Sequence, residues 1–125
     1  MERISTTLSV EAVVENIKHI LADKQITLFT VFDHALEAGR LGLQLSATQV
    51  VVFGDPKVGT MLMQEDNAVA LDLPLKLLVF EDSNQTWIAF SKPSLLADQY
   101  DLHAQKAILL KMDTLLEQIA QEASK

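Results

Sequence analysis

The sequence predicts an α+β fold, with an antiparallel sheet of about five strands and helices packed on it. Runs rich in β-branched and aromatic residues alternate with helical segments that are too short for the full crossovers of a parallel sheet. Two of these runs flank the turn-like segment Asp82–Gln85, as in a hairpin. The longest helical pattern of the chain follows the last run. This order favours β-α-β4-α with extra short helices and a long C-terminal helix.

The first half of the chain contains three predicted strands and two helices. The strands are expected at Ile4–Leu8, Ile26–Phe32 and Thr48–Phe53. A helix is expected after the N-cap Ser9, because apolar residues recur at helical spacing up to Leu21. A short helix, His34–Ala38, is expected after a second N-cap, Asp33, and ends at the following glycines.

The second half contains two more strands and the closing helix. The strands are expected at Leu75–Glu81 and Thr86–Phe90. Helical segments are expected from about Thr60 to Ala70, from Pro93 through Tyr100, and from Ala104 to Ala123. No repeat or low-complexity segment interrupts this order, so residues 1–125 are expected to form a single domain.

Composition narrows the classes of function. The net charge is −7, and the ten Lys and Arg are scattered, which argues against nucleic acid and against an anionic membrane surface as partners. The chain has no cysteine, its N-terminus lacks the apolar segment of a secretory signal, and no apolar run approaches the ~20 residues of a membrane span. A cytoplasmic protein is therefore expected.

The two strands of the predicted hairpin indicate whether the protein associates with a second subunit. In Leu75–Phe80 and again in Trp87–Phe90, both alternating sets of side chains are largely apolar. A sheet that is wet on one face would alternate apolar and polar residues. Both faces are therefore expected to be covered, by the extra helices or by a second subunit, and we expect a homodimer.

The segment from Gly54 to Thr60 is the first candidate site. Two glycines and a proline follow a β-branched strand and precede a helix, where backbone N–H groups can face a small polar or anionic ligand. Gly54, Asp55, Lys57, Gly59 and Thr60 are the candidate ligand-binding residues. A nucleoside triphosphate is not expected, because Thr60 stands where a phosphate-binding loop requires lysine. The alternative is a tight turn without a ligand.

These residues also carry a resemblance. The chain resembles the bacterial and archaeal family called domain of unknown function 302, through Phe53-Gly54-Asp55-Pro56-Lys57-Val58-Gly59-Thr60, Ala70-Leu71-Asp72-Leu73-Pro74-Leu75-Lys76, Asp33-His34, Glu81-Asp82, Pro93 and Tyr100. The resemblance implies a fold similar to that of the TATA-binding protein, with a curved sheet, and a homodimer. It implies no reaction. A fold shared with a DNA-binding protein is no argument for DNA binding.

His34 and Asp72 are the candidate catalytic residues. Histidine is a common acid–base and metal-ligating residue type, so His34 could act as general base, metal ligand or ligand contact, or it could only begin a helix capped by Asp33. Asp72 could orient His34, or it could be a turn residue. The glycine-containing segment, His34 and Asp72 are expected to converge, because a strand end and a turn from an adjacent strand would meet at one edge of the sheet.

Three hypotheses of function remain open at this point. The first is a ligand-binding or interaction module with a pocket between Gly54–Thr60, His34 and Asp72. The second is a small enzyme that uses His34 as general acid or base, oriented by Asp33 or Asp72. The third is a structural partner protein with a large apolar surface patch. The three histidines, without cysteine, have no recognised metal-ligand spacing, and the sequence leaves the identity of any cofactor unknown.

Overall fold

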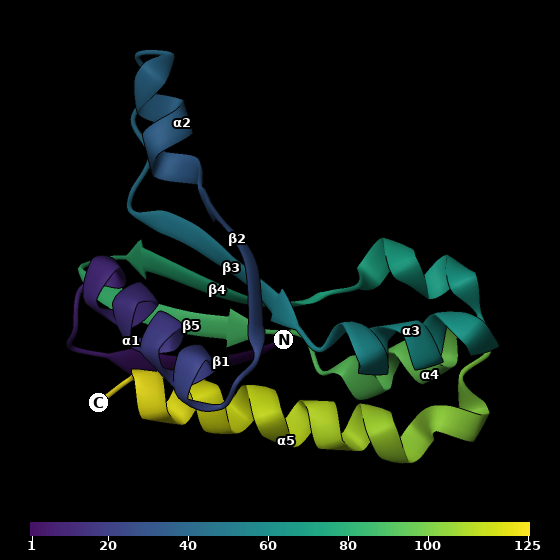
Figure 1. The fold of residues 1–125 in the computed structure, drawn as a ribbon. Helices are drawn as coiled ribbons and strands as arrows, with labels where there is room; N and C mark the ends of the chain where they lie inside the picture. Colours follow the sequence, from purple (N-terminus) through teal and green to yellow (C-terminus); the bar gives the residue numbers. More distant parts are fainter.

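Five antiparallel strands form one curved sheet in the computed structural model, which describes residues 1–125 (Figure 1). The strands are β1 (Glu2–Thr6), β2 (Thr27–Asp33), β3 (Thr48–Gly54), β4 (Leu75–Asp82) and β5 (Gln85–Phe90). Their order across the sheet is β1-β5-β4-β3-β2, so the first strand pairs with the last. The predicted α+β fold with about five antiparallel strands is confirmed.

Two long helices cover one face of this sheet. The helices are α1 (Val10–Asp23), α2 (His34–Arg40), α3 (Pro56–Glu65), α4 (Leu96–Gln99) and α5 (Lys106–Ala123), with 3-10 turns η1 (Asn67–Asp72), η2 (Pro93–Leu95) and η3 (His103–Gln105). Figure 1 shows α1 and α5 below the sheet, whereas α2 stands away from it on the opposite side. Helices α3 and α4 lie beyond one end of the sheet, beside the first half of α5 (Figure 1).

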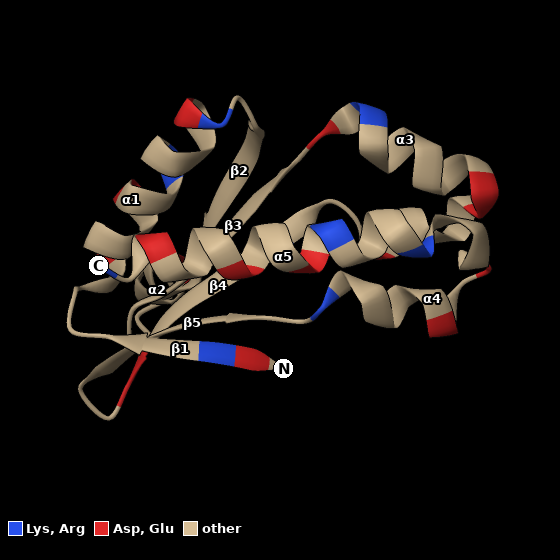
Figure 2. Cartoon of the chain, turned by 90° about the horizontal axis from the view of Figure 1, so that it is seen from below, with Lys and Arg blue, Asp and Glu red and all other residues tan.

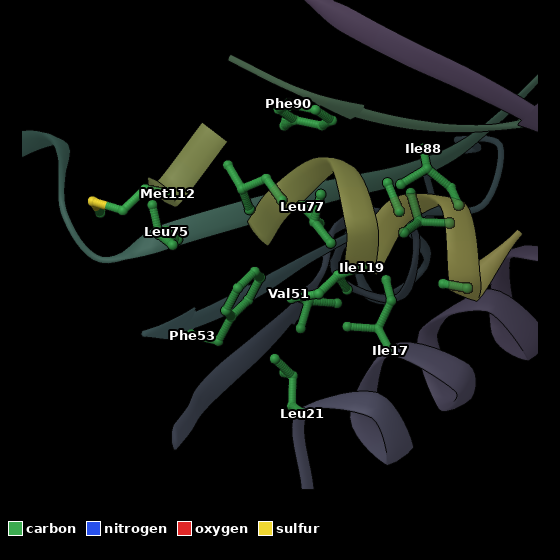
Figure 3. Close-up of a cluster of buried hydrophobic side chains, with 14 of the residues drawn as sticks. Ile17, Leu21, Val51, Phe53, Leu75, Leu77, Ile88, Phe90, Met112 and Ile119 are labelled. Atoms are coloured by element: carbon green, nitrogen blue, oxygen red, sulfur yellow. The ribbon is translucent and has the colours of Figure 1, made fainter. Parts of the chain in front are cut away.

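The core lies between the sheet and α1 and α5. Phe53, Leu77 and Ile88 come from three neighbouring strands and are fully buried. They meet Ile17 of α1 and Ile119 of α5, as Figure 3 shows. These side chains alternate along their strands with residues of the other face, so every second residue of a strand packs against the helices.

Polar contacts fix the C-terminal end of α5. The Thr6 hydroxyl donates to the carbonyl of Ser124 at 2.6 Å, and Nδ2 of Asn16 donates to the carbonyl of Ala123 at 3.1 Å. The last carbonyls of a helix have no partner within the helix. Side chains from β1 and α1 supply those partners here, and they join the two ends of the chain.

The helix expected from Thr60 to Ala70 is wrong at both ends. It begins at Pro56, because Asp55 is its N-cap and proline suits the first helical position. It ends at Glu65, and Asp66 then caps the separate turn η1. Gly59 and Thr60 therefore lie inside a helix and not in a loop.

The other face of the sheet has no long helix against it. A cross-strand row on this face contains Phe32, Val50, Leu78 and Ala89, one from each of β2 to β5, and ends at Arg3 of β1. We call this row and its neighbours Phe80 and Trp87 the open face. The Arg3 guanidinium lies over the rings of Phe80 and Trp87, at 5.3 and 5.4 Å from the ring centroids.

Candidate functional site

A groove of about 550 Å³ lies between α3, the start of β2 and the first half of α5. Gly54, Asp55, Gly59 and Thr60 line it, so four of the five predicted ligand-binding residues are in its wall. The fifth, Lys57, is on the exposed surface of α3 and does not line the groove. The volume is in the range of small-molecule sites.

The N-terminus of α3 is closed by groups of the chain itself. Pro56 has no N–H, and the N–H of Lys57 donates to Oδ1 of Asp55 at 2.9 Å. The N–H of Gly59 donates to the Asp55 carbonyl at 2.9 Å. A carboxylate thus already occupies the position where the helix dipole would favour an anion. This end of the groove is poorly suited to an anionic ligand.

The two glycines of the segment differ in their surroundings. Gly54 ends β3 next to the start of β4, and a Cβ placed there would lie 3.5 Å from Cβ of Pro74 and 3.8 Å from Cε2 of Phe29. A Cβ at Gly59 would meet only Cε of Met63, at 3.9 Å. The missing side chain of Gly59 therefore leaves space within the groove.

The second wall of the groove was not predicted from the sequence. It comes from α5 and β2, through Ile26, Phe29, Ile108, Lys111, Met112 and Leu115. The sequence predicted a helix from Ala104 to Ala123 but assigned none of its residues to the site. The length of α5 could have indicated this second wall. A helix of 18 residues is about 27 Å long and extends past strands of six to eight residues. Its first turns therefore face α3 across the groove and not the sheet.

Asp72 forms a hydrogen bond beside the groove. At the end of η1, its Oδ2 accepts a hydrogen bond from the hydroxyl of Tyr100. This bond, followed by partial burial and the charges of Asp72 and Asp66, raises the pKa of Tyr100 above its ordinary value of 10.0. Oδ2 of Asp66 also accepts from the N–H of Asp101, at 3.0 Å. Both carboxylates thus attach η1 to the segment after α4.

His34 does not converge with the other candidate residues, and that expectation is wrong. Thr27 pairs with Gly54, whereas Asp33 pairs with Gln49 at the other end of β3. His34 follows Asp33, so it lies about 20 Å from Gly54 along the strands. Because β2 and β3 are antiparallel, the end of one strand meets the start of the other.

The neighbours of His34 are those of an exposed helix start. Its ring is stacked on that of Phe32, with centroids 6.3 Å apart. Oδ1 of Asp33 accepts from the N–H of Leu36 at 2.9 Å and so caps α2. Asp72, the other candidate partner of His34, is bonded to Tyr100 at the end of α4.

The charged side chains of the chain do not gather into a metal site or a basic patch. No group of three or more His, Asp or Glu side chains gathers in a way that could hold a metal ion. Figure 2 shows acidic and basic residues interspersed over α3 and α5, without a basic patch. No helix combines the length and the apolar character that crossing a bilayer requires.

Comparison with known proteins places the chain in a family. The model of the family "Domain of unknown function DUF302" matches residues 2–119. A crystal structure of an uncharacterized conserved DUF302 protein from Bacillus stearothermophilus superposes with a TM-score of 0.87. That superposition covers 98% of this chain and 96% of the other, at 18% sequence identity, and shows a shared fold.

Curated relatives match over a shorter part of their own length. Proteins named "Fluoride-specific ion channel FluC 1" from Brucella suis and Brucella abortus are 34% identical over 110 residues. The match covers 85% of this chain but only 43% and 41% of those proteins, so this chain spans less than half of their length. The family match covers nearly the whole chain and agrees with the sheet and helices described above, and the chain belongs to the family Domain of unknown function DUF302.

Proposed function

We propose that this protein is a binding module that holds a small, largely apolar molecule in the groove between α3 and α5. The observation that carries the proposal is the lining: ten of the seventeen residues around the 550 Å³ groove are hydrophobic. Binding sites for small molecules are mostly apolar, with a few polar groups that orient the ligand. Asp55, Thr60 and Lys111 supply such polar groups at the rim.

The lining also indicates the chemistry of the ligand. Asp55 and Lys111 are the charged residues of the wall, and their formal charges cancel. The N–H of Lys57 at the start of α3 is bonded by Asp55. A neutral ligand therefore fits this groove better than an anion does. Met63 and Met112 contribute flexible thioether side chains that adapt to differently shaped apolar molecules.

The test uses Nile red, a neutral apolar dye, as the probe. Gly59→Leu places a side chain in the groove, where a Cβ meets only Met63. Gly39→Leu is the matched control, because Gly39 is also a helix glycine, on the distant α2, and a Cβ added there would have nothing within 4 Å. We expect Gly59→Leu to weaken dye binding at least about tenfold and Gly39→Leu to leave it unchanged. Equal affinities of the two variants would contradict the proposal.

Fluoride conduction is not carried over from the Brucella relatives. Their printed name describes whole proteins of which this chain spans less than half. The groove described here has an apolar wall, which suits a dehydrated anion poorly. The enzyme hypothesis receives no support from the geometry either, because Asp33 caps α2 and Asp72 lies far from His34.

We also propose that the protein forms a homodimer through α2 and the open face. Helix α2 has seven residues and none of them is buried. Isolated helices shorter than about 12 residues are marginally stable in water. Apolar side chains nevertheless crowd α2 and the following segment, where Leu36, Leu41, Leu43 and Leu45 are all more than half exposed. Together with α2, we call these residues the arm.

A second copy is the partner that supplies a matching surface. The arm and the open face lie on the same side of the sheet, opposite α1 and α5 (Figure 1). In an interface with twofold symmetry each copy contributes both surfaces, so the arm of one can cover Phe32, Phe80 and Trp87 on the open face of the other and leave Val50, Leu78 and Ala89 uncovered. The leucines of two arms and the faces they cover would bury on the order of 1,000–2,000 Å², as stable dimers do.

Sedimentation of the purified chain at micromolar concentration tests the dimer. We expect a dimer for the wild type and a monomer for the double variant Leu41→Glu, Leu43→Glu. The control is Leu71→Glu with Leu110→Glu, which adds the same charges at exposed leucines outside the arm. The control variant should remain dimeric. A monomeric wild type, or an equal loss of dimer in both double variants, would contradict this interface.

A further inference from the structure

A second pocket, distinct from the groove, lies between the open face and the segment that leads into α4. Its volume is about 480 Å³. Val50, Leu78 and Ala89 of the sheet form one side, and Leu95 and Leu96 form the other. We propose that this pocket binds an organic anion with an apolar body and a single carboxylate or phosphate head. This inference goes beyond the groove proposal and does not depend on it.

The positive charge comes from two lysines. Lys76 of β4 and Lys92, which precedes η2, both line the pocket and both are exposed. Neither takes part in an ion pair, because the ion pairs of the structure are Lys18–Glu15 and Arg40–Glu37. Nζ of Lys76 makes one weak contact, 3.5 Å from the Pro74 carbonyl. Both ammonium groups are therefore free to meet a ligand.

Asp72 is the carboxylate in the same wall, and it opposes an anion. Its Oδ2 already accepts the hydroxyl of Tyr100, which partly neutralises its effect within the pocket. The formal charge of the lining side chains is +1, from Lys76 and Lys92 against Asp72. In a chain of net charge −7 this local excess of positive charge is unusual. The amide of Gln99 and the hydroxyl of Ser91 are further hydrogen-bond donors there.

The pocket requires both parts of the proposed ligand. Nine of its sixteen lining residues are hydrophobic, so a bare inorganic ion would leave the apolar wall exposed to water. A neutral apolar molecule would leave both lysines without a partner. An apolar body with one anionic head satisfies the wall and the lysines together, and attraction between exposed charges weakens as salt is added.

Calorimetric titration with defined probes tests the proposal. The probes are octanoate, octyl phosphate, 1-octanol and inorganic phosphate. We expect octanoate or octyl phosphate to bind at one site per chain, at least about fivefold more tightly than 1-octanol or inorganic phosphate, and more weakly at high salt. The comparison of the two anions identifies which head group the lysines prefer.

Two variants locate the site. Lys76→Gln with Lys92→Gln should weaken binding of the preferred anion at least about fivefold. Lys24→Gln with Lys106→Gln removes the same charge from exposed lysines outside both pockets and should leave binding unchanged. Gly59→Leu, which fills the groove, should also leave it unchanged. The proposal is overturned if neither anion binds at millimolar concentration, if both lysine pairs have equal effects, or if Gly59→Leu abolishes binding of the anion.

Discussion

The hydroxyl of Tyr100 donates a hydrogen bond to Oδ2 of Asp72, and this contact joins η1 to the end of α4. A second carboxylate, that of Asp66, accepts the N–H of Asp101 in the same region. Because these bonds connect segments that are distant in the sequence, they hold the connection between β3 and β4 against the segment that leads from α4 to α5. Both pockets have walls in this region, so its rigidity bears on both.

Tyr100 gives this contact a spectroscopic readout, because it is the sole tyrosine of the chain. Ultraviolet absorbance of the phenolate should show a pKa above 10.0 in the folded protein. Asp72→Asn removes the carboxylate that is the main cause and should lower the pKa of Tyr100. Asp82→Asn, at the β4–β5 turn, is the control and should leave it unchanged. An unaltered Tyr100 titration in Asp72→Asn would contradict the assigned cause.

The same shift predicts a dependence of stability on pH. The pKa of Tyr100 is raised in the folded state, so between pH 10 and that pKa the unfolded chain loses the phenol proton more readily. The stabilising contribution is complete below pH 10 and is lost as the pH rises through the folded-state pKa. Urea denaturation of the wild type and of Tyr100→Phe should converge as the pH increases through this window.

The caps of α3 and α2 should contribute unequally to stability. Asp55→Ala removes the cap of a helix that packs on the core through the buried Leu62, and should lower the free energy of unfolding by about 1 kcal/mol. Asp33→Ala removes the cap of α2, which buries no residue, and should cost less. Urea denaturation of both variants under dilute, monomeric conditions provides the comparison. A larger effect of Asp33→Ala would show that α2 is coupled to the core.

Two glycines should respond in opposite ways to alanine. Gly59→Ala should raise the free energy of unfolding by about 0.5–1 kcal/mol, because the helix accepts a Cβ there without a close contact. Gly42→Ala should lower it by about 1 kcal/mol, since Gly42 has a φ of +75°, which L-residues with a Cβ rarely adopt. Thermal unfolding measures both. A loss of stability in Gly59→Ala would show that the groove wall tolerates no added methyl group.

The buried hydroxyl of Thr6 should matter more than an exposed one. Thr6→Val leaves the carbonyl of Ser124 and the N–H of Leu8 without their partner, which should cost about 1–3 kcal/mol. Thr48→Val removes a similar hydroxyl-to-carbonyl bond at an exposed position and should cost less than about 0.5 kcal/mol. The denaturant midpoints of the two variants measure these two losses of stability. Equal losses would mean that burial of the Thr6 hydroxyl has no effect.

The sequence predicted those parts of the fold whose causes are local. Ser9 caps α1 as expected, by accepting a hydrogen bond from the N–H of Ala12 at 3.1 Å. The two residues are only three positions apart, so the signal for this cap is local. The turn of the β4–β5 hairpin, with positive φ at Ser83 and Asn84, is equally local. Asp55 and Pro56 carried the same kind of signal, but beside two glycines they were interpreted as a loop.

The site was less predictable because its walls come from distant segments. Placing His34 near Gly54 required the direction of β2 against β3, which no short stretch of sequence specifies. The groove wall from Ile108 to Leu115 depended in the same way on how far α5 extends beyond the sheet. The residue types therefore predicted the wall of the groove around Gly54–Thr60, whereas the wall from β2 and α5 depends on the tertiary arrangement.

The pairing of β1 with β5 has a consequence for how the chain matures during synthesis. The strands β2 to β5 lie next to one another in chain order, so each can pair with the strand before it soon after it leaves the ribosome. Glu2 pairs with Phe90, so β1 must wait until nearly ninety residues have emerged. Contacts of such long sequence separation slow folding, because the intervening loop must close first. We therefore expect the N-terminal strand to be the last to join the sheet, together with α5, whose end it holds.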